Sequence, residues 1–471
     1  MGTHPAPDIA VGAGGASFRA ELGGSVDGYN AFMLVATLLV LMMTTPALAL
    51  FYGGMTRSKS VLNMMMMSYA AMAIVGIIWV LWGYSMVFSG EGGIDTFFNS
   101  PFANFALDGV GYDGYTFMMF QLTFAVITTA LISGAIADRV KFSAWLVFVP
   151  IWATLSYFPL AHMVFGCTDS ALICTQIGAQ DYAGGTAVHI NAGVAGLVLA
   201  LVIGKRVGFG REPMRPHNLT LTMLGAALLW VGWYGFNVGS IVFSDDLDAS
   251  DQFLAETGLT FANTTLATMA AILGWLVVEK VLHGKATTLG AASGIVAGLV
   301  AITPAAGAVN ILGALAIGLV SGALCAWAVG LKFKLKYDDS LDVVGVHLVG
   351  GIVGTVMIGL FSVTSGEGDN IAGGAVDGLF YGGGIGSLVD QVLGVLVAVA
   401  WSGVVTLLIA LAIKFTMGWR IDEEAEVEGI DFDQHGESAY DLNTSLSSGS
   451  GGSFAAATRP EPSTRTEGAH A

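Results

Sequence analysis

Residues 188–196 read VHINAGVAG, and residues 346–354 read VHLVGGIVG. Each stretch begins with Val-His and has glycines four and seven residues after the histidine, and each lies in a membrane-length apolar run. An ionisable side chain at bilayer depth is costly, so it normally faces a pathway or a partner and not lipid. His189 and His347, in matching frames, therefore predict an internally duplicated membrane protein with a histidine pair at its centre, as in transporters built from repeats.

The composition excludes a soluble protein. Of the 471 residues, 54% are hydrophobic and only 11% are charged, a balance that soluble domains do not show. Runs long enough to cross a bilayer, roughly 20 residues each, are found at 31–52, 61–88, 115–137, 142–165, 184–203, 219–242, 261–282, 287–306, 310–331, 343–361 and 388–417. Because the bilayer core offers no water to backbone polar groups, these eleven spans must be helices.

Charged residues between the spans support this number. The odd-numbered connections are basic and hold Arg57, Lys59, Arg139, Lys141, Lys205, Arg206, Arg211, Arg215, Lys280, Lys285, Lys332, Lys334 and Lys336. The even-numbered connections hold no Lys or Arg in the sequence and carry Glu91, Asp95, Asp108, Asp113, Asp169, Asp181, Asp245, Asp246, Asp248, Asp251, Glu256, Glu367, Asp369 and Asp377. By the positive-inside rule the N-terminus lies outside and the C-terminus inside the cytoplasmic membrane.

The fold class predicted is an all-α integral membrane protein of two five-helix repeats plus a final helix. An odd number of spans per repeat inverts the second repeat relative to the first, so the two histidines meet near the midplane. The glycines that follow each histidine are read as positions of close helix packing. The span at 388–417 lies outside the repeats and could brace the bundle or mediate oligomerisation.

Both ends of the chain differ from the apolar region between them. Residues 1–30 lack a basic start followed by a short apolar stretch, so we expect an extracellular segment and no cleavable signal peptide. The eleven-helix domain occupies 31–417, and an acidic cytoplasmic tail follows at 418–442. Residues 443–471 begin with a Ser/Gly-rich stretch and are expected to be disordered.

The cysteines and the net charge limit the chemistry. Cys167 and Cys174 fall in one predicted outer connection, where a disulfide can form but is not required. Cys325 is read as a small apolar residue. No metal-ligand spacing, nucleophile–base pair or phosphate loop stands out, so we expect no cofactor and no enzyme, and the net charge of −17 disfavours nucleic acid.

Several longer motifs carry a resemblance to one family. They are DYAGGTAVHINAGVAG at 181–196, IGKR at 203–206, FQLTF at 120–124, WYGFNVGS at 233–240, DVVGVH at 342–347 and GIDFDQHGESAY at 429–440. Together they resemble the Amt/Mep/Rh ammonium transporters, of the bacterial Amt type, over roughly residues 30–440. The resemblance implies the eleven-helix Amt fold, a homotrimer with one pore per subunit, and ammonium as substrate, with methylammonium as a further candidate.

The resemblance also implies an outer recruitment site and a gate. Phe124 and Ser240 would bind the cation, the ring through its π face. The third position, commonly Trp, is Phe165 here, a weaker cation–π partner without an N–H. Phe124 and Phe236 would form a stacked gate below this site, and Phe120 could line the wall.

Further residues are assigned to the pore and its supports. His189 and His347 would share a proton and offer sites to NH3, while Trp233 lines the pore. Asp181 is read as a cap or structural residue whose field could help a cation in the vestibule. Asp342 and His162 are read as structural.

The acidic tail would ordinarily be read as a disordered, solvated segment. By resemblance it is instead a regulatory element that couples subunits and responds to a PII-type signal protein, through Gly429, Asp431, His435, Gly436, Glu437 and Tyr440. The predicted function is capture of NH4+, its deprotonation, and passage of NH3 with separate proton transfer. The alternatives are an ammonium sensor and a neutral gas channel of the Rh type.

Overall fold

The computed structural model describes residues 26–212, 214–243, 249–364 and 376–440. Within these ranges every regular element is a helix, and β-bridges occur only as isolated pairs. Most of the expected extracellular segment 1–30 and the whole expected extension 443–471 lie outside the described residues.

Over the ranges that the structure describes, 11 helices are long and apolar enough to cross a membrane. They are Gly28–Met55, Val61–Phe88, Tyr112–Ile136, Phe142–Gly166, Gly185–Ile203, Leu219–Val238, Ala249–His283, Thr288–Ala305, Ile311–Leu335, Val344–Phe361 and Gly386–Thr416. The predicted number of spans and the all-α class are confirmed, and the chain is a multi-pass membrane protein.

The first, second and fourth spans contain a π-helical segment between two α-helical parts. The first five spans and their connections contain α2 (Val26–Met42), η1 (Met43–Leu48), α3 (Ala49–Met55), α4 (Val61–Ile78), η2 (Trp79–Gly83), α5 (Tyr84–Phe88), η3 (Phe105–Leu107), η4 (Tyr112–Gly114), α6 (Tyr115–Ile132), η5 (Ser133–Ile136), α7 (Phe142–Trp152), η6 (Ala153–Tyr157), α8 (Phe158–Ala161), η7 (His162–Gly166), η8 (Leu172–Ile177), η9 (Gly185–Ile190) and α9 (Asn191–Ile203). The rest of the described chain contains α10 (Leu219–Val238), α11 (Ala249–His283), α12 (Thr288–Ile302), η10 (Thr303–Ala305), α13 (Ile311–Ala328), α14 (Leu331–Leu335), η11 (Val344–Leu348), α15 (Val349–Phe361), η12 (Leu379–Tyr381), α16 (Gly386–Thr416), α17 (Glu423–Glu428) and α18 (Ile430–His435).

The seventh span begins earlier than its hydrophobic run predicts. The sequence places its start at 261 and assigns Glu256 to an acidic loop, but α11 is already helical from Ala249. The Glu256 carboxylate is buried, and it accepts hydrogen bonds from the Tyr182 hydroxyl (2.8 Å) and the Gln252 amide (2.8 Å). These two donors offset the cost of burying the carboxyl group, which is why Glu256 can lie inside the helix.

Two matching junctions reveal the inverted repeat. The third and eighth spans both end in a short 3-10 segment, η5 and η10. At one junction Leu341 N–H, just before the tenth span, donates to Gly134 O (3.0 Å) at the end of the third. At the other, Tyr182 N–H, just before the fifth span, donates to Pro304 O (3.0 Å) at the end of the eighth. The third and eighth spans run in opposite directions, so the two histidine-bearing spans enter from opposite ends.

Glycines allow the histidine-bearing spans to approach each other and the eighth span closely. A Cβ atom on Gly193 of α9 would lie 2.5 Å from the Leu348 nitrogen, and one on Gly354 of α15 would lie 2.0 Å from the Ala301 oxygen. Both contacts are with backbone, which cannot move aside as a side chain can. Small residues that allow such backbone approach are typical of helix contacts inside membranes.

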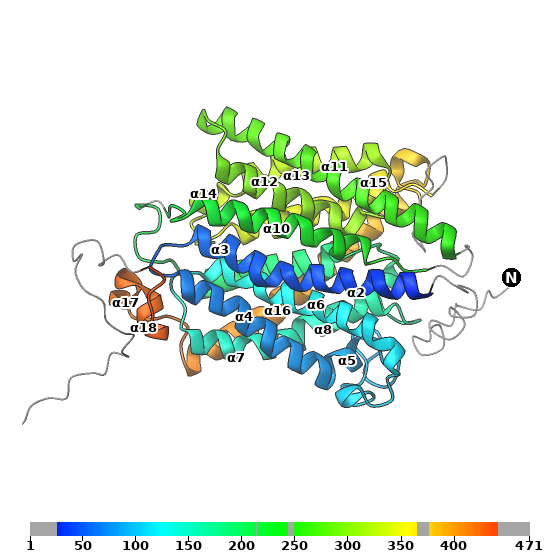
Figure 1. The fold of residues 1–471 in the computed structure, drawn as a ribbon, viewed down its shortest axis with the longest axis horizontal. Coiled ribbons are helices and arrows are strands. Elements are labelled where there is room, and N and C mark those ends of the chain that lie inside the picture. Colours follow the sequence, from blue (N-terminus) through cyan, green and yellow to red (C-terminus); the bar gives the residue numbers. More distant parts are fainter. Residues whose placement is uncertain (1–25, 213, 244–248, 365–375, 441–471) are drawn as a thin grey trace, which may run out of the picture. The chain divides into compact units, whose positions relative to one another are not determined.

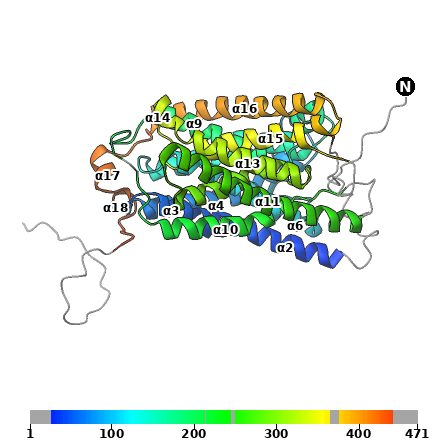
Figure 2. The ribbon, with the colours of Figure 1, turned by 90° about the horizontal axis from the view of Figure 1, so that it is seen from above.

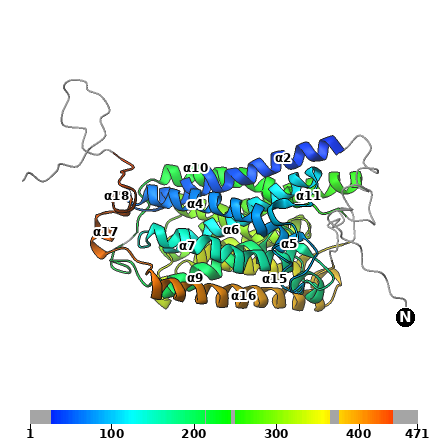
Figure 3. The same cartoon turned by 90° about the horizontal axis from the view of Figure 1, so that it is seen from below.

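The eleventh span stands outside the repeats. α16 packs lengthwise along α9 and α15 at one side of the bundle (Figures 2 and 3). Its polar side chains bond across to the bundle, since Ser402 Oγ donates to Asn191 O (2.8 Å) and Trp152 Nε1 donates to Thr406 Oγ1 (2.9 Å). At least part of its role is therefore to brace the fifth span.

Replacing Gly354 with alanine should destabilise the bundle, because its Cβ cannot fit beside Ala301 O. We expect a loss of about 1–3 kcal/mol, the usual cost of overpacking a close-packed interior. Thermal unfolding in detergent of Gly354→Ala and of the control Gly76→Ala, where nothing lies within 4 Å of the new Cβ, makes the comparison. Equal melting temperatures for the two variants would contradict the close crossing.

Candidate functional site

Two phenylalanine rings from different repeats close the centre of the bundle. Phe124 on α6 and Phe236 on α10 stack with their centroids 4.1 Å apart and their planes 13° apart. Both side chains are buried. Rings stacked at this separation leave no room for water between them, so the pair forms a closed barrier.

Further aromatic residues surround this pair. Phe165 on η7 contacts Phe124 edge to face with centroids 6.2 Å apart, and Phe120 does so at 5.0 Å. Ser240 follows α10, and its hydroxyl donates to Phe236 O (2.8 Å) while the side chain stays half-buried. The structure therefore brings Phe124, Phe165 and Phe120 into contact, and connects Ser240 to them through Phe236.

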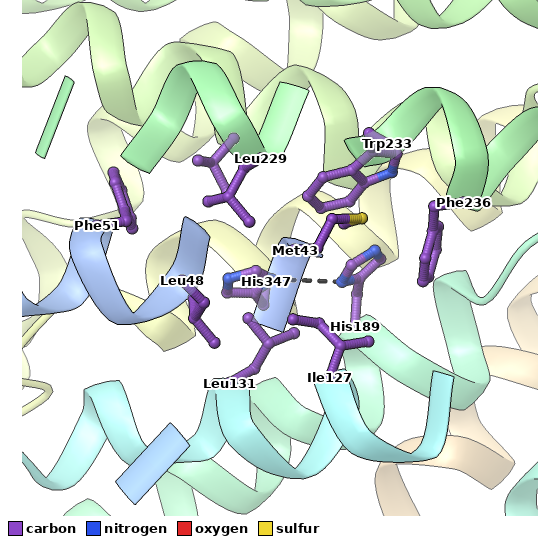
Figure 4. A pocket seen from close by; sticks show the side chains of 11 residues that line it. Met43, Leu48, Phe51, Ile127, Leu131, His189, Leu229, Trp233, Phe236 and His347 are labelled. Carbon is purple, nitrogen blue, oxygen red and sulfur yellow. Dashed lines mark hydrogen bonds between the residues drawn. The ribbon is translucent and has the colours of Figure 1, made fainter. Parts of the chain in front are cut away.

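The two histidines meet next to Phe236 (Figure 4), whose ring centroid lies 6.3 Å from that of His189. His189 Nδ1 and His347 Nδ1 lie 3.3 Å apart, and both side chains are buried. Since this contact needs one donor and one acceptor, the pair holds a single proton between its Nδ1 atoms. His189 Nε2 has no hydrogen-bond partner in the described part of the chain, so it is available to a small molecule in the cavity.

Trp233 packs against the imidazole ring of His189. Its indole stacks on His189 with centroids 5.5 Å apart, and its Nε1 donates to Thr303 Oγ1 (2.7 Å) in η10. Figure 4 shows Trp233 and Phe236 on the same side of the histidine pair.

A narrow cavity lies beside Phe236 and the two histidines. Apart from the two histidines its lining is apolar, namely Met43, Leu48, Phe51, Ile127, Leu131, Leu229, Trp233, Phe236 and Val296. A second cavity shares Phe51, Val296 and His347 with the first and extends to Asp342. The sequence missed the apolar wall, because leucine, isoleucine and methionine look the same in a sequence whether they face a pore or lipid.

Asp181 supports the helix that carries His189. Its carboxylate accepts the backbone N–H groups of Gly184 (2.7 Å), Gly185 (2.6 Å) and Thr186 (2.7 Å), and also the Thr186 hydroxyl. Burial raises the pKa of Asp181, and these hydrogen bonds act against that shift. With all its oxygens bonded to the start of η9, Asp181 acts as an N-terminal cap.

An equivalent cap, absent from the sequence interpretation, supports His347. Asp339 accepts the backbone N–H groups of Val343 (3.0 Å) and Val344 (2.8 Å) at the start of η11. Burial raises the pKa of this carboxyl group. Asp339 and Asp181 each precede their histidine by eight residues, and this shared spacing is the signal that could have identified Asp339. Asp342, interpreted from the sequence as structural, accepts a hydrogen bond from Lys332 Nζ (2.6 Å) and also lines the second cavity.

The connection outside Phe165 contains the two cysteines. Cys167 and Cys174 form a disulfide between η7 and η8. Cys325 is a free, buried thiol in α13. The described residues include no group of three or more metal-ligating side chains.

The acidic tail is folded against one end of the bundle. α18 lies beside the beginning of α4, and α17 packs against α18 (Figure 1). Asp431 accepts the backbone N–H groups of Leu62 (3.0 Å) and Asn63 (2.8 Å), and His435 Nε2 lies 3.0 Å from Asn63 Oδ1. Burial raises the pKa of Asp431, while these backbone hydrogen bonds lower it. The tail thus caps the second span.

The other tail residues differ in how firmly they are held. Gly429 has a φ of 129°, and a Cβ there would lie 2.5 Å from Lys59 Cβ. Gly436 ends α18 with a φ of 69°, a left-handed conformation that glycine adopts without strain. Glu437 and Tyr440 are exposed.

These observations define a class of protein: a polytopic helical membrane protein with a largely apolar cavity and a buried histidine pair at its centre. A model described as the Ammonium Transporter Family matches residues 31–440. The ammonium transporter of Mycobacterium tuberculosis (strain H37Rv) is 53% identical over 443 residues, covering 88% of this chain and 90% of the relative. That of Bacillus subtilis is 45% identical over 428 residues, with coverages of 88% and 98%. The chain therefore belongs to the ammonium transporter family.

Solved structures support the same fold. The crystal structure of Candida albicans Mep2 matches with a TM-score of 0.76 and 33% identity, covering 89% of this chain and 92% of that one. A structure titled "Sensor Amt Protein" matches with a TM-score of 0.75 and 25% identity, covering 86% and 98%.

Removing the newly found cap should damage the second histidine span. Asp339→Ala leaves the N–H groups of Val343 and Val344 without their acceptor, at a cost of about 1–3 kcal/mol for each buried group. We expect a lower melting temperature than for wild type, and a similar fall for Asp181→Ala. Asp433→Ala, at an exposed tail position, is the control. If Asp339→Ala melted like this control, Asp339 would not be a cap.

Proposed function

We propose that this chain transports ammonium across the cytoplasmic membrane. The observation that carries the proposal is the order of groups along one path: stacked Phe124 and Phe236, then the His189–His347 pair, then an apolar cavity. Membership of the ammonium transporter family supports the choice of substrate.

Capture takes place on the outer side of the stacked rings. Ammonium binds against the faces of Phe124 and Phe165, since an aromatic ring attracts a cation by ~0.5–2 kcal/mol. The Ser240 hydroxyl accepts an N–H bond from it. Phe165 supplies a weaker aromatic face than tryptophan and no N–H, so the affinity depends more heavily on Phe124 and Ser240.

Deprotonation follows because the path beyond the rings cannot hold a cation. A bare ion in a low-dielectric interior costs several kcal/mol even after relaxation, and the lining of the cavity is apolar except for the histidines. Ammonium therefore releases its proton near the gate. Movement of the Phe124 and Phe236 rings then admits NH3, while hydrated ions stay outside.

The histidine pair carries the separated proton. The Nδ1 atoms of His189 and His347, 3.3 Å apart, can exchange the one proton they share, and the rings offer hydrogen-bonding sites to NH3. Potassium has no proton to release, so it cannot use this route. The proton and NH3 recombine at the cytoplasmic end.

The tail and the assembly form the regulatory part of the proposal. The N-terminus lies outside and the tail inside, which agrees with the docking of Asp431 beside the basic connection that holds Arg57 and Lys59. Three chains associate as a homotrimer with one pore each. A PII-type signal protein acts at the cytoplasmic face through the regulatory tail at 418–442.

An ammonium-evoked current on a solid-supported membrane tests the proposal. Wild type in liposomes should give a saturable current, and His347→Ala should reduce it at least tenfold, because a positioned proton carrier contributes about 10²–10⁴ in rate. His283→Ala, at an exposed position at the end of α11, is the control and should keep the full current.

Other outcomes would support other functions. No current in wild type, with NH3 flux still detected by internal pH, would indicate a neutral gas channel. Neither current nor flux would favour a sensor. A full current in His347→Ala would contradict the role of the histidine pair.

A further inference from the structure

His162, a third histidine, lies fully buried at the outer end of the fourth span. It begins η7, the short π-helix that also carries Phe165. Phe165, a residue of the proposed recruitment site, follows three residues later. The contacts of His162 therefore affect the wall of the outer mouth.

Both ring nitrogens of His162 face backbone carbonyl groups. Nε2 lies 2.6 Å from Asp95 O, and Nδ1 lies 2.9 Å from Val87 O. A carbonyl oxygen can only accept a hydrogen bond, and a neutral imidazole has only one N–H. A ring that satisfies both contacts must carry a proton on each nitrogen.

The alternative neutral ring fits less well. It would keep Nε2–H on Asp95 O and accept at Nδ1 from the Asn99 amide, 3.4 Å away. The Nδ1 lone pair would then face the oxygen of Val87 at 2.9 Å, and the Asn99 amide already donates to that oxygen at 3.3 Å.

One carboxylate lies close to the His162 ring. The Asp95 carboxylate approaches Nε2 to 3.9 Å, although its side chain is 39% exposed, which weakens the attraction. The other groups that contact the ring are neutral: the Val87 carbonyl on α5, the Asn99 amide in the outer connection, and Gly166 on η7 itself. A Cβ on Gly166 would lie 2.8 Å from both His162 Nδ1 and Val87 O, so the glycine makes room for their contact.

We infer that His162 is held as an imidazolium and positions the wall of the outer mouth that carries Phe165. Its two charge-assisted hydrogen bonds join η7 to the end of α5 and to the outer connection at Asp95. Loss of either bond would loosen η7. The expected effect of His162 on transport rests on the recruitment site proposed above. The protonation state of His162 does not depend on that proposal.

The protonation state can be read directly. We would label the histidines with ¹⁵N, reconstitute wild type in liposomes at pH 7, and assign the His162 signals by their loss in His162→Gln. Both ring nitrogens of His162 should show protonated chemical shifts. The His189–His347 pair, which holds one proton at its Nδ1 contact, is an internal reference for an unprotonated nitrogen. An unprotonated nitrogen on His162 would overturn the inference.

Transport measurements test the positioning role. At constant pH 7, His162→Gln should raise the ammonium concentration at half-maximal current by about two- to fivefold, the contribution of one aromatic face to a cation site. The maximal current should change little, because the gate and the histidine pair are untouched. His283→Gln should leave both values unchanged. An unchanged half-saturation in correctly assembled His162→Gln would contradict the positioning role.

The two proposals fail in different ways. If wild type gave no saturable current, the transport proposal would fail, and the ¹⁵N spectrum would still decide the state of His162. If His162→Gln did not assemble, as judged by size exclusion, the wild-type signals could be assigned by their proximity to Val87 and Asp95, and they would decide the question alone.

Discussion

A cation that leaves water must have its hydration shell replaced, and an apolar bundle has few groups that can replace it. The arrangement along the path follows from this constraint. Aromatic rings gather at one end of this path, where Phe165 and Phe120 contact Phe124. The stacked rings then exclude water, and the polar groups beyond them on the cavity wall are the two imidazoles. The carboxylates of Asp181 and Asp339 lie at the starts of spans, with their oxygens bonded to backbone N–H groups.

The inverted repeat explains how two histidines reach one point. Each histidine lies in a π-helical segment, η9 or η11, at the start of its span. An aspartate eight residues before the histidine caps that segment. π-Helical turns are rare and are often found at functional sites. Because the two spans enter from opposite ends and cross at glycines, their rings meet through equivalent nitrogens, Nδ1 to Nδ1.

The sequence predicted the parts of this arrangement that depend on hydropathy and spacing. The eleven spans follow from apolar runs and alternating loop charges, and the structure confirms their number. Glu256 was misread as a loop residue because its partners, Tyr182 and Gln252, become neighbours only in the folded chain. Asp339 received no role from the sequence, from which Asp342 was interpreted only as a structural residue. The contacts of His162 could not be predicted, because its two ring nitrogens meet carbonyl groups from segments that are distant in the sequence.

The central claim is that the histidine pair makes the path selective: only a substrate that can release a proton passes through it. Its most direct test is the potassium current of the double variant His189→Ala/His347→Ala in liposomes. Wild type is measured in parallel, and the ammonium current of both proteins is recorded as well. The account predicts that wild type excludes potassium and that the double variant conducts it together with ammonium, since the emptied space admits water. Continued exclusion of potassium by a double variant that still moves ammonium would contradict the account.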